Sequence, residues 1–123
     1  MAFDVMIVDD SAAIRKILQR VLRQTELPIG NLYEAADGQL ALAALRIQKV
    51  GLVLTDINMP NMDGLGLLRS LKADAELKHI PVVVITTEGS QAKVMEAVES
   101  GAAGYIRKPF TAEQIRDKLT GLY

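Results

Sequence analysis

The sequence predicts an α/β fold in which five parallel strands alternate with five helices in one doubly wound domain. Short apolar runs that end at polar or acidic residues alternate with longer segments whose apolar residues recur at helical spacing. Such strict alternation is typical of a parallel sheet with right-handed crossovers and helices on both faces. The 123 residues suffice for one ordinary domain with a single core. We therefore expect residues 1–123 to form this domain, without an output domain.

The predicted strands are short, apolar and bounded by residues that favour turns. In chain order they cover residues 3–8, 32–36, 52–56, 82–87 and 105–106. The first, third and fourth are the most apolar, which is typical of central strands buried on both faces. The shorter second and fifth strands are expected at the edges. This arrangement suits the order 2-1-3-4-5 known from flavodoxin-like sheets.

The predicted helices each follow a strand. The first begins after Ser11 as N-cap and ends before residues 27–30, and the second covers about residues 39–48 and follows a break at residues 37–38. The third carries four leucines between residues 65 and 71. The fourth begins at Gly89 and Ser90 and ends at Gly101, and the fifth covers about residues 112–121 after Thr111. Apolar stripes predict their buried sides, including Ile14, Ile17, Leu18, Val21 and Leu22 in the first helix and Val94, Met95 and Val98 in the fourth.

The composition excludes several classes of function. There are no cysteines, so disulfides, thiolate metal sites and thiol nucleophiles are absent. The formal net charge of −1 gives no general attraction to nucleic acid or to anionic membranes. The first ten residues lack the basic start that is typical of a signal peptide, so we expect none, and no apolar run approaches the roughly 20 residues that span a bilayer. We therefore expect a soluble, cytoplasmic monomer that binds neither nucleic acid nor membranes.

Three acidic side chains follow two strands that are neighbours in the predicted order. Asp9 and Asp10 come directly after the first strand, and Asp56 ends the third. Because ligand sites of open α/β sheets lie outside the carboxyl ends of the strands, we expect the three carboxylates to converge. Two carboxylates about 5 Å apart repel by roughly 3 kcal/mol at an effective dielectric constant of about 20. Either one is protonated or a cation is present, and all-oxygen ligands favour Mg²⁺ or Mn²⁺.

A hydroxyl and an ammonium group are predicted at the same edge. Thr86 lies at the end of the fourth strand, and Lys108 follows the fifth. Both can stabilise charge on the oxygens of a phosphoryl group while the Asp56 carboxylate attacks phosphorus to form an acyl phosphate. Each residue alone is more simply explained as a helix cap, a strand end or a solvated lysine. Their coincidence at the ends of four strands favours phosphorylation of Asp56.

Four motifs at these positions resemble the receiver domain of two-component response regulators, in particular its stand-alone, CheY-like chemotaxis type. The motifs are IVDDS at residues 7–11, DINMPNMDG at 56–64, ITT at 85–87 and KPF at 108–110. The resemblance covers essentially the whole chain. It implies a signalling protein that catalyses its own phosphorylation and dephosphorylation and is not otherwise an enzyme.

The resemblance implies a role for each acidic residue. Asp56 corresponds to the phosphoacceptor, and Asp10 corresponds to a direct ligand of Mg²⁺. Asp9 corresponds to an acid that acts largely through metal-bound water. Asn58 corresponds to a metal ligand through its backbone carbonyl.

The remaining site residues correspond to a switch. Lys108 matches the lysine that pairs with the acids and then with the phosphoryl group, and the bond before Pro109 is expected to be cis. Thr86 matches the hydroxyl that moves toward the phosphoryl oxygens, and Tyr105 matches the aromatic side chain that turns inward behind it. The implied partner surface combines the fourth helix, the last strand and the last helix.

These correspondences imply a phosphoryl donor and a target protein. The donor is a sensor histidine kinase, and the target is a flagellar motor switch or, alternatively, a histidine phosphotransferase in a relay. An aspartyl-phosphate phosphohydrolase is disfavoured because Asn58 stands where such an enzyme has its second aspartate as general acid. A flavin-binding module is disfavoured because Asp9 and Asp10 occupy its phosphate loop and repel phosphate when no metal is bound.

Overall fold

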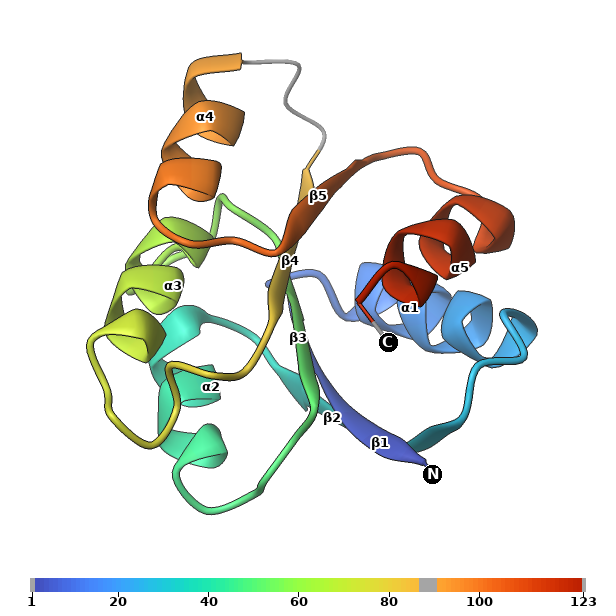
Figure 1. The fold of residues 1–123 in the computed structure, drawn as a ribbon, viewed down its shortest axis with the longest axis horizontal. Coiled ribbons are helices and arrows are strands. Elements are labelled where there is room, and N and C mark those ends of the chain that lie inside the picture. The colour runs from blue at the N-terminus through green and yellow to red at the C-terminus, as the bar shows by residue number, and fades with distance from the viewer. Residues whose placement is uncertain (1, 87–90, 123) are drawn as a thin grey trace.

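The computed structural model describes residues 2–86 and 91–122, and these form the predicted α/β domain (Figure 1). Five parallel strands are arranged in the order β2-β1-β3-β4-β5. The strands are β1 (Phe3–Val8), β2 (Ile29–Ala35), β3 (Leu52–Thr55), β4 (Val82–Thr86) and β5 (Gly104–Arg107). The helices are α1 (Ala12–Gln24), α2 (Gly38–Leu45), α3 (Gly64–Lys72), α4 (Gln91–Glu99) and α5 (Ala112–Thr120). The predicted fold class and strand order are confirmed.

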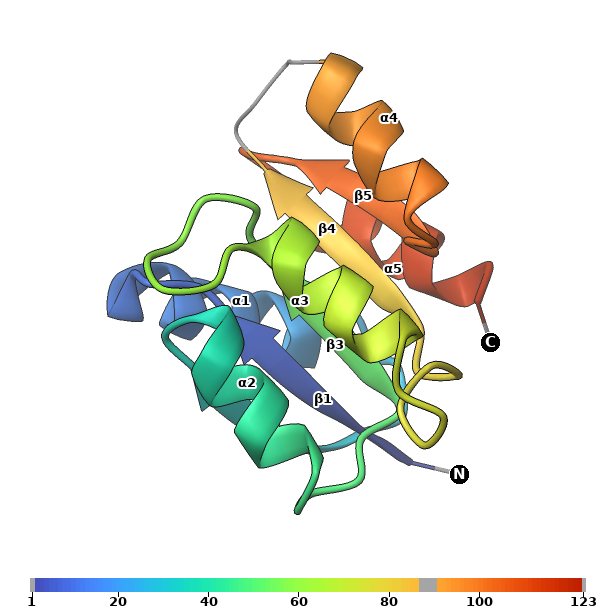
Figure 2. The same cartoon turned by 90° about the vertical axis from the view of Figure 1, so that its left-hand side faces the viewer.

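Helices cover both faces of the sheet. In Figures 1 and 2, α1 and α5 lie on one face and α2, α3 and α4 lie on the other. Each face has its own apolar cluster, and every residue of β3 and β4 is buried because these strands contact both clusters. In the described part of the chain, no helix is long and apolar enough to cross a membrane.

The second strand is longer than the sequence predicts. It begins at Ile29 and has seven residues, whereas β5 at the opposite edge has four. Its first residues are extended because Ile29 pairs with Phe3 and because the Asp4 carboxylate accepts the backbone N–H of Asn31 at 2.8 Å. The strand order confirms that β2 lies at an edge of the sheet. The short length from which this position was predicted is wrong.

Side-chain caps fix where four helices begin. Ser11 caps α1 and Thr111 caps α5, as predicted. Asp37, predicted only as part of a turn, accepts the backbone N–H of Leu40 at 2.8 Å. Helix α2 therefore begins at Gly38, one residue before its predicted start. Asp63 caps α3 directly after the loop that follows β3. Ser11, which follows Asp10, and Asp63, which ends the loop after Asp56, thus cap helices that begin beside the predicted site.

Helix α4 packs through a side chain that was not predicted, and of the predicted stripe only Val94 is half-buried. Met95 and Val98 are 56% and 50% exposed, whereas Ala97 is 1% exposed and belongs to the core. Ala97 packs into the apolar cluster on the face of the sheet that α2 and α3 also cover (Figure 1). The helix ends at Glu99, and Gly101 terminates it as predicted, with a φ of 101° and a hydrogen bond from the Ala102 N–H to the Ala97 carbonyl.

Ile17, predicted on the buried stripe of the first helix, is 45% exposed because it lies at the margin of a stripe centred on Leu18 and Leu22. Thr87, Gly89 and Ser90, predicted to end the fourth strand and to begin the fourth helix, lie outside the described residues.

Candidate functional site

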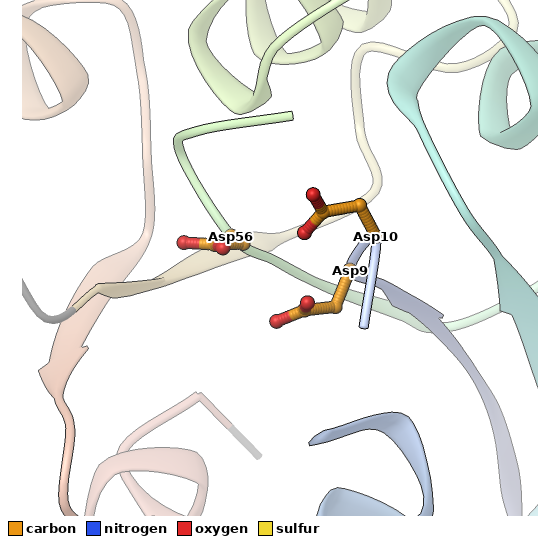
Figure 3. A group of neighbouring side chains, drawn as sticks. All are labelled: Asp9, Asp10 and Asp56. Carbon is orange, nitrogen blue, oxygen red and sulfur yellow. The ribbon is translucent and has the colours of Figure 1, made fainter. Parts of the chain in front are cut away.

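The three predicted carboxylates lie together at the carboxyl ends of β1 and β3. Asp9, Asp10 and Asp56 each offer an oxygen atom within 4.8 Å of those of the other two. The strands bring them together because Val8 pairs with Thr55 and the Asp56 N–H donates to the Val8 carbonyl at 2.9 Å. Figure 3 shows the three side chains directed to the same side. The predicted convergence of the acids is confirmed.

Lys108 connects this cluster to the far edge of the sheet. Its Nζ atom lies 3.0 Å from Asp9 Oδ2 and 3.6 Å from Asp56 Oδ2, and its side chain is only 14% exposed. Its backbone N–H donates to the Thr86 carbonyl at 2.8 Å. The bond from Lys108 to Pro109 is cis, as the resemblance implied. Lys108 thus supplies one positive charge to three negative ones.

The pKa of Asp56 reflects the balance of charge in the cluster. Burial raises the pKa of the Asp56 carboxyl above its usual value of 3.8, because the charged form loses hydration. The Lys108 ammonium and the Ile57 N–H, which donates to Asp56 Oδ1 at 2.8 Å, act in the opposite direction. The carboxylates of Asp9 and Asp10 raise the pKa further. An additional cation would favour the charged form of Asp56.

The two neighbouring acids of β1 differ in their contacts. Asp9 is buried, and its Oδ1 accepts the Ser11 N–H at 2.9 Å while its Oδ2 pairs with Lys108. Asp10 is exposed, and within the described part of the chain its carboxylate has no hydrogen-bond or ion-pair partner. Asp10 is therefore the carboxylate most available to a new ligand. Its oxygen, together with those of Asp9 and Asp56, makes a hard, all-oxygen donor set that fits Mg²⁺ or Mn²⁺.

The structure places the other predicted site residues at different depths. Thr86 is fully buried at the end of β4, beside the strand that leads to Asp56. Asn58 is exposed and lies two residues after Asp56. Tyr105 on β5 is 39% exposed, and the Nζ atom of Lys118 lies 5.6 Å from the centre of its ring. Tyr105 thus belongs to the outer surface between β5 and α5, and not to the acidic cluster.

Two contacts at the site are absent from the sequence prediction. Gly64, predicted only as a loop residue, lies so close to the strand end that a Cβ there would overlap the Asp56 carbonyl oxygen. Arg15 donates from Nη1 to the Asp9 carbonyl oxygen at 2.6 Å. The glycine itself was the available signal, because a glycine that opens a helix is compatible with a close approach as well as with a turn.

Comparison with known proteins shows the family. The model of the response regulator receiver domain matches residues 5–120. The chain belongs to this family. This receiver domain is 43% identical over 119 residues to the chemotaxis protein CheY-3 of Vibrio cholerae serotype O1, an alignment that covers 97% of the chain and 90% of the relative.

Solved structures agree with this result. The receiver domain superposes on the chemotaxis response regulator CheY4 of Vibrio cholerae with a TM-score of 0.88, at 30% identity and with 100% of both chains covered. It superposes on the Mn²⁺-bound form of the response regulator Rcp1 with a TM-score of 0.80, at 29% identity and with 98% of this chain and 91% of that chain covered. The resemblance and the fold that it implied are confirmed.

Proposed function

We propose that this receiver domain is a response regulator that accepts a phosphoryl group on Asp56 from a sensor histidine kinase and acts in chemotaxis. The observation that carries the proposal is the largely buried Asp56 carboxylate, which lies in a cluster of three acids and 3.6 Å from the Lys108 ammonium. The likeness to CheY-3 supports chemotaxis as the pathway. The domain acts on no other substrate and signals by binding another protein.

The chemistry requires Asp56 to be ionised. One carboxylate oxygen of Asp56 forms a bond to phosphorus while the bond from phosphorus to the donor nitrogen breaks, and the electron pair of that bond leaves with the donor imidazole. Lys108 stabilises the charge on the transferring phosphoryl oxygens. The carboxylates of Asp9, Asp10 and Asp56 and the backbone carbonyl of Asn58 would hold Mg²⁺. When bound, this ion neutralises charge on the phosphoryl oxygens.

Phosphorylation changes the partners of Lys108 and Thr86. An aspartyl phosphate adds roughly one negative charge to Asp56 and provides new acceptor oxygens. These oxygens attract the Lys108 ammonium away from Asp9 and draw the Thr86 hydroxyl toward the site. The change passes to β5 because Thr86 pairs with Arg107 and Val84 pairs with Tyr105 across the two strands. Tyr105 then turns inward.

The partner surface is formed by α4, β5 and α5. Three large apolar side chains, those of Met95, Val98 and Tyr105, are exposed on its first two elements. Exposed apolar side chains of this kind are suited to contact with a protein partner. The target is a flagellar motor switch, or a histidine phosphotransferase if the domain works in a relay. Tyr105 links the surface to the site because it lies on β5 and pairs with Val84, two residues before Thr86 on β4.

The test is the intact mass of the protein after incubation with a small acyl-phosphate donor, with Mg²⁺ or with a chelator. We expect the wild type to gain one phosphoryl group only when Mg²⁺ is present, and Asp56→Asn to gain none. Asp4→Asn is the matched control, because Asp4 lies at the opposite end of β1. Labelling of Asp56→Asn, or metal-independent labelling of the wild type, would contradict the proposal.

A further inference from the structure

The loop that follows Asp56 is fixed by a helix that is distant in sequence. This loop comprises residues 57–63 and contains Asn58. Near its end, Asn61 Nδ2 donates to Asp37 Oδ2 at 2.9 Å, and the Met62 carbonyl accepts the N–H of Gly38 at 2.9 Å. Asp37 and Gly38 form the beginning of α2. Two adjacent hydrogen bonds therefore attach the loop to the N-terminus of that helix.

Asp37 makes two contacts with different purposes. Its Oδ1 caps α2 by accepting the Leu40 N–H at 2.8 Å, while its Oδ2 accepts the Asn61 amide. The carboxylate is buried, and these two hydrogen bonds lower its pKa below the usual value. A serine in this position could form the cap, but its side chain would be too short for the contact with Asn61.

The geometry of the contact is closely constrained. A Cβ on Gly38 would lie 2.7 Å from the Met62 carbonyl oxygen, so a larger residue would force the loop and the helix apart. Asn61 has a φ of 66°, in the left-handed region that asparagine tolerates better than most residues. At the other end of the loop, the Gly64 N–H donates to the Ile57 carbonyl at 2.8 Å. The loop is thus held at both ends.

We propose that Asp37 and Asn61 are positioning residues that hold the 57–63 loop in one conformation and thereby increase the affinity of the acidic site for Mg²⁺. The inference rests on the proposed function, in which the Asn58 carbonyl is a metal ligand. A loop that is already ordered loses less conformational entropy when the ion binds. Without the contact between Asp37 and Asn61, part of the binding free energy is spent on ordering the loop.

Two substitutions remove the contact between Asp37 and Asn61 and leave the cap of α2 in place. Asp37→Ser keeps a capping oxygen and removes the contact with Asn61. Asn61→Gly removes the same contact from the other side and suits the positive φ. Asp4→Ser is the matched control, because it makes the same chemical change at the far end of β1, where Asp4 accepts the Asn31 N–H. All three variants are studied in the full chain.

Two measurements test the proposal. Calorimetric titration with Mg²⁺ is expected to show a dissociation constant about three- to tenfold higher for Asp37→Ser and for Asn61→Gly. The double variant is expected to be no weaker than either single variant, because both changes remove one contact. Amide hydrogen exchange without metal is expected to be about tenfold faster at Gly38 and Gly64 in these variants. Asp4→Ser should leave both quantities unchanged.

The positioning role of Asp37 and Asn61 and the proposed function fail under different results. Dissociation constants within about twofold of the wild type in both single variants, or additive effects in the double variant, would overturn the positioning role. Unchanged exchange at Gly38 and Gly64 would also overturn it. A wild type that binds Mg²⁺ but gains no phosphoryl group would refute the proposed function alone. A wild type that binds no Mg²⁺ would refute both.

Discussion

At the scale of single residues, the site depends on the balance of charge around Asp56. A nucleophilic carboxylate must be ionised, yet partial burial and two acidic neighbours favour its neutral form. Lys108 and the Ile57 N–H offset this effect in part. In the absence of metal, the ionised Asp56 therefore destabilises the folded state. A bound Mg²⁺ would remove this destabilisation because it adds positive charge beside the three acids.

Asp56→Asn is expected to be more stable than the wild type at neutral pH without metal. The folded-state pKa of Asp56 lies above its usual value of 3.8, so the folded protein holds its proton more tightly than the unfolded chain does. The neutral Asp56 carboxyl therefore stabilises the folded state at low pH. This stabilisation is lost as pH rises from 3.8 through the raised pKa.

Urea unfolding at a series of pH values, with a chelator present, measures this difference. The advantage of Asp56→Asn should disappear as the pH falls below 3.8. Asp37→Asn is expected to behave in the opposite way and to be less stable than the wild type at neutral pH. The pKa of Asp37 is lowered, so the stabilisation by its charge is lost on acidification. An advantage of Asp56→Asn that grows toward acid pH would contradict the account.

At the scale of elements, the turn from β3 into α3 depends on one glycine. Gly64 begins α3 and packs against the backbone of Asp56 and Ile57. Its lack of a side chain lets the helix start directly behind the strand end. The position of the Asp56 carboxylate is therefore coupled to the start of α3.

Gly64→Ala is expected to lower the free energy of unfolding by about 3 kcal/mol, because its Cβ overlaps backbone atoms that cannot move freely. Gly121→Ala is the matched control. A Cβ at residue 121 meets its nearest atom, the Lys118 carbonyl oxygen, at 3.6 Å. Its expected effect is smaller than about 1 kcal/mol. Equal effects of the two substitutions in chemical denaturation would show that the close approach is unimportant.

The burial of side chains on α4 can be tested in the same way. Met95→Gln is expected to change the free energy of unfolding by less than about 0.5 kcal/mol, because Met95 is 56% exposed. Ala97→Leu is expected to destabilise by about 2 kcal/mol, because Ala97 is 1% exposed and packs within the apolar core. Thermal unfolding of both variants measures the difference. The reverse order would mean that α4 packs through Met95.

At the scale of the whole molecule, the sequence predicted what depends on local pattern and topology. The apolar strands set the sheet, and the sheet brings Asp9 and Asp10 beside Asp56. The length of β2 was missed because its first residues are extended through contacts with β1, namely the pairing of Ile29 with Phe3 and the hydrogen bond from Asn31 to Asp4. The buried side of α4 was missed because the larger apolar residues of the helix, and not the small Ala97, determined the predicted stripe.

The contacts that support the site also lay beyond sequence reasoning. The hydrogen bond between Asp37 and Asn61 joins residues 24 positions apart, and no periodic pattern indicates it. The close approach of Gly64 to Asp56 depends on the angle between a strand and a helix. Both features arise from packing, whereas the acidic cluster follows from strand order alone. The roles of the individual site residues stay predictions.

The domain as a whole should become more stable when Mg²⁺ binds. At 100 times its dissociation constant, the ion is expected to raise the free energy of unfolding by about 2.7 kcal/mol. At the same Mg²⁺ concentration, Asp10→Asn should show a much smaller rise in the free energy of unfolding, because the exposed Asp10 carboxylate is the one most available to the ion. Denaturant unfolding with and without a chelator measures this effect. A rise of equal size in Asp10→Asn would exclude Asp10 as a ligand.

The most direct test of the central claim is to locate the phosphoryl group within the labelled protein. After labelling with an acyl-phosphate donor and Mg²⁺, borohydride reduction converts an aspartyl phosphate to homoserine, which peptide mass spectrometry can place in the sequence. The account predicts homoserine at position 56 and at no other acidic residue. Homoserine at residue 9, 10 or 63 instead would show that a different carboxylate is the nucleophile.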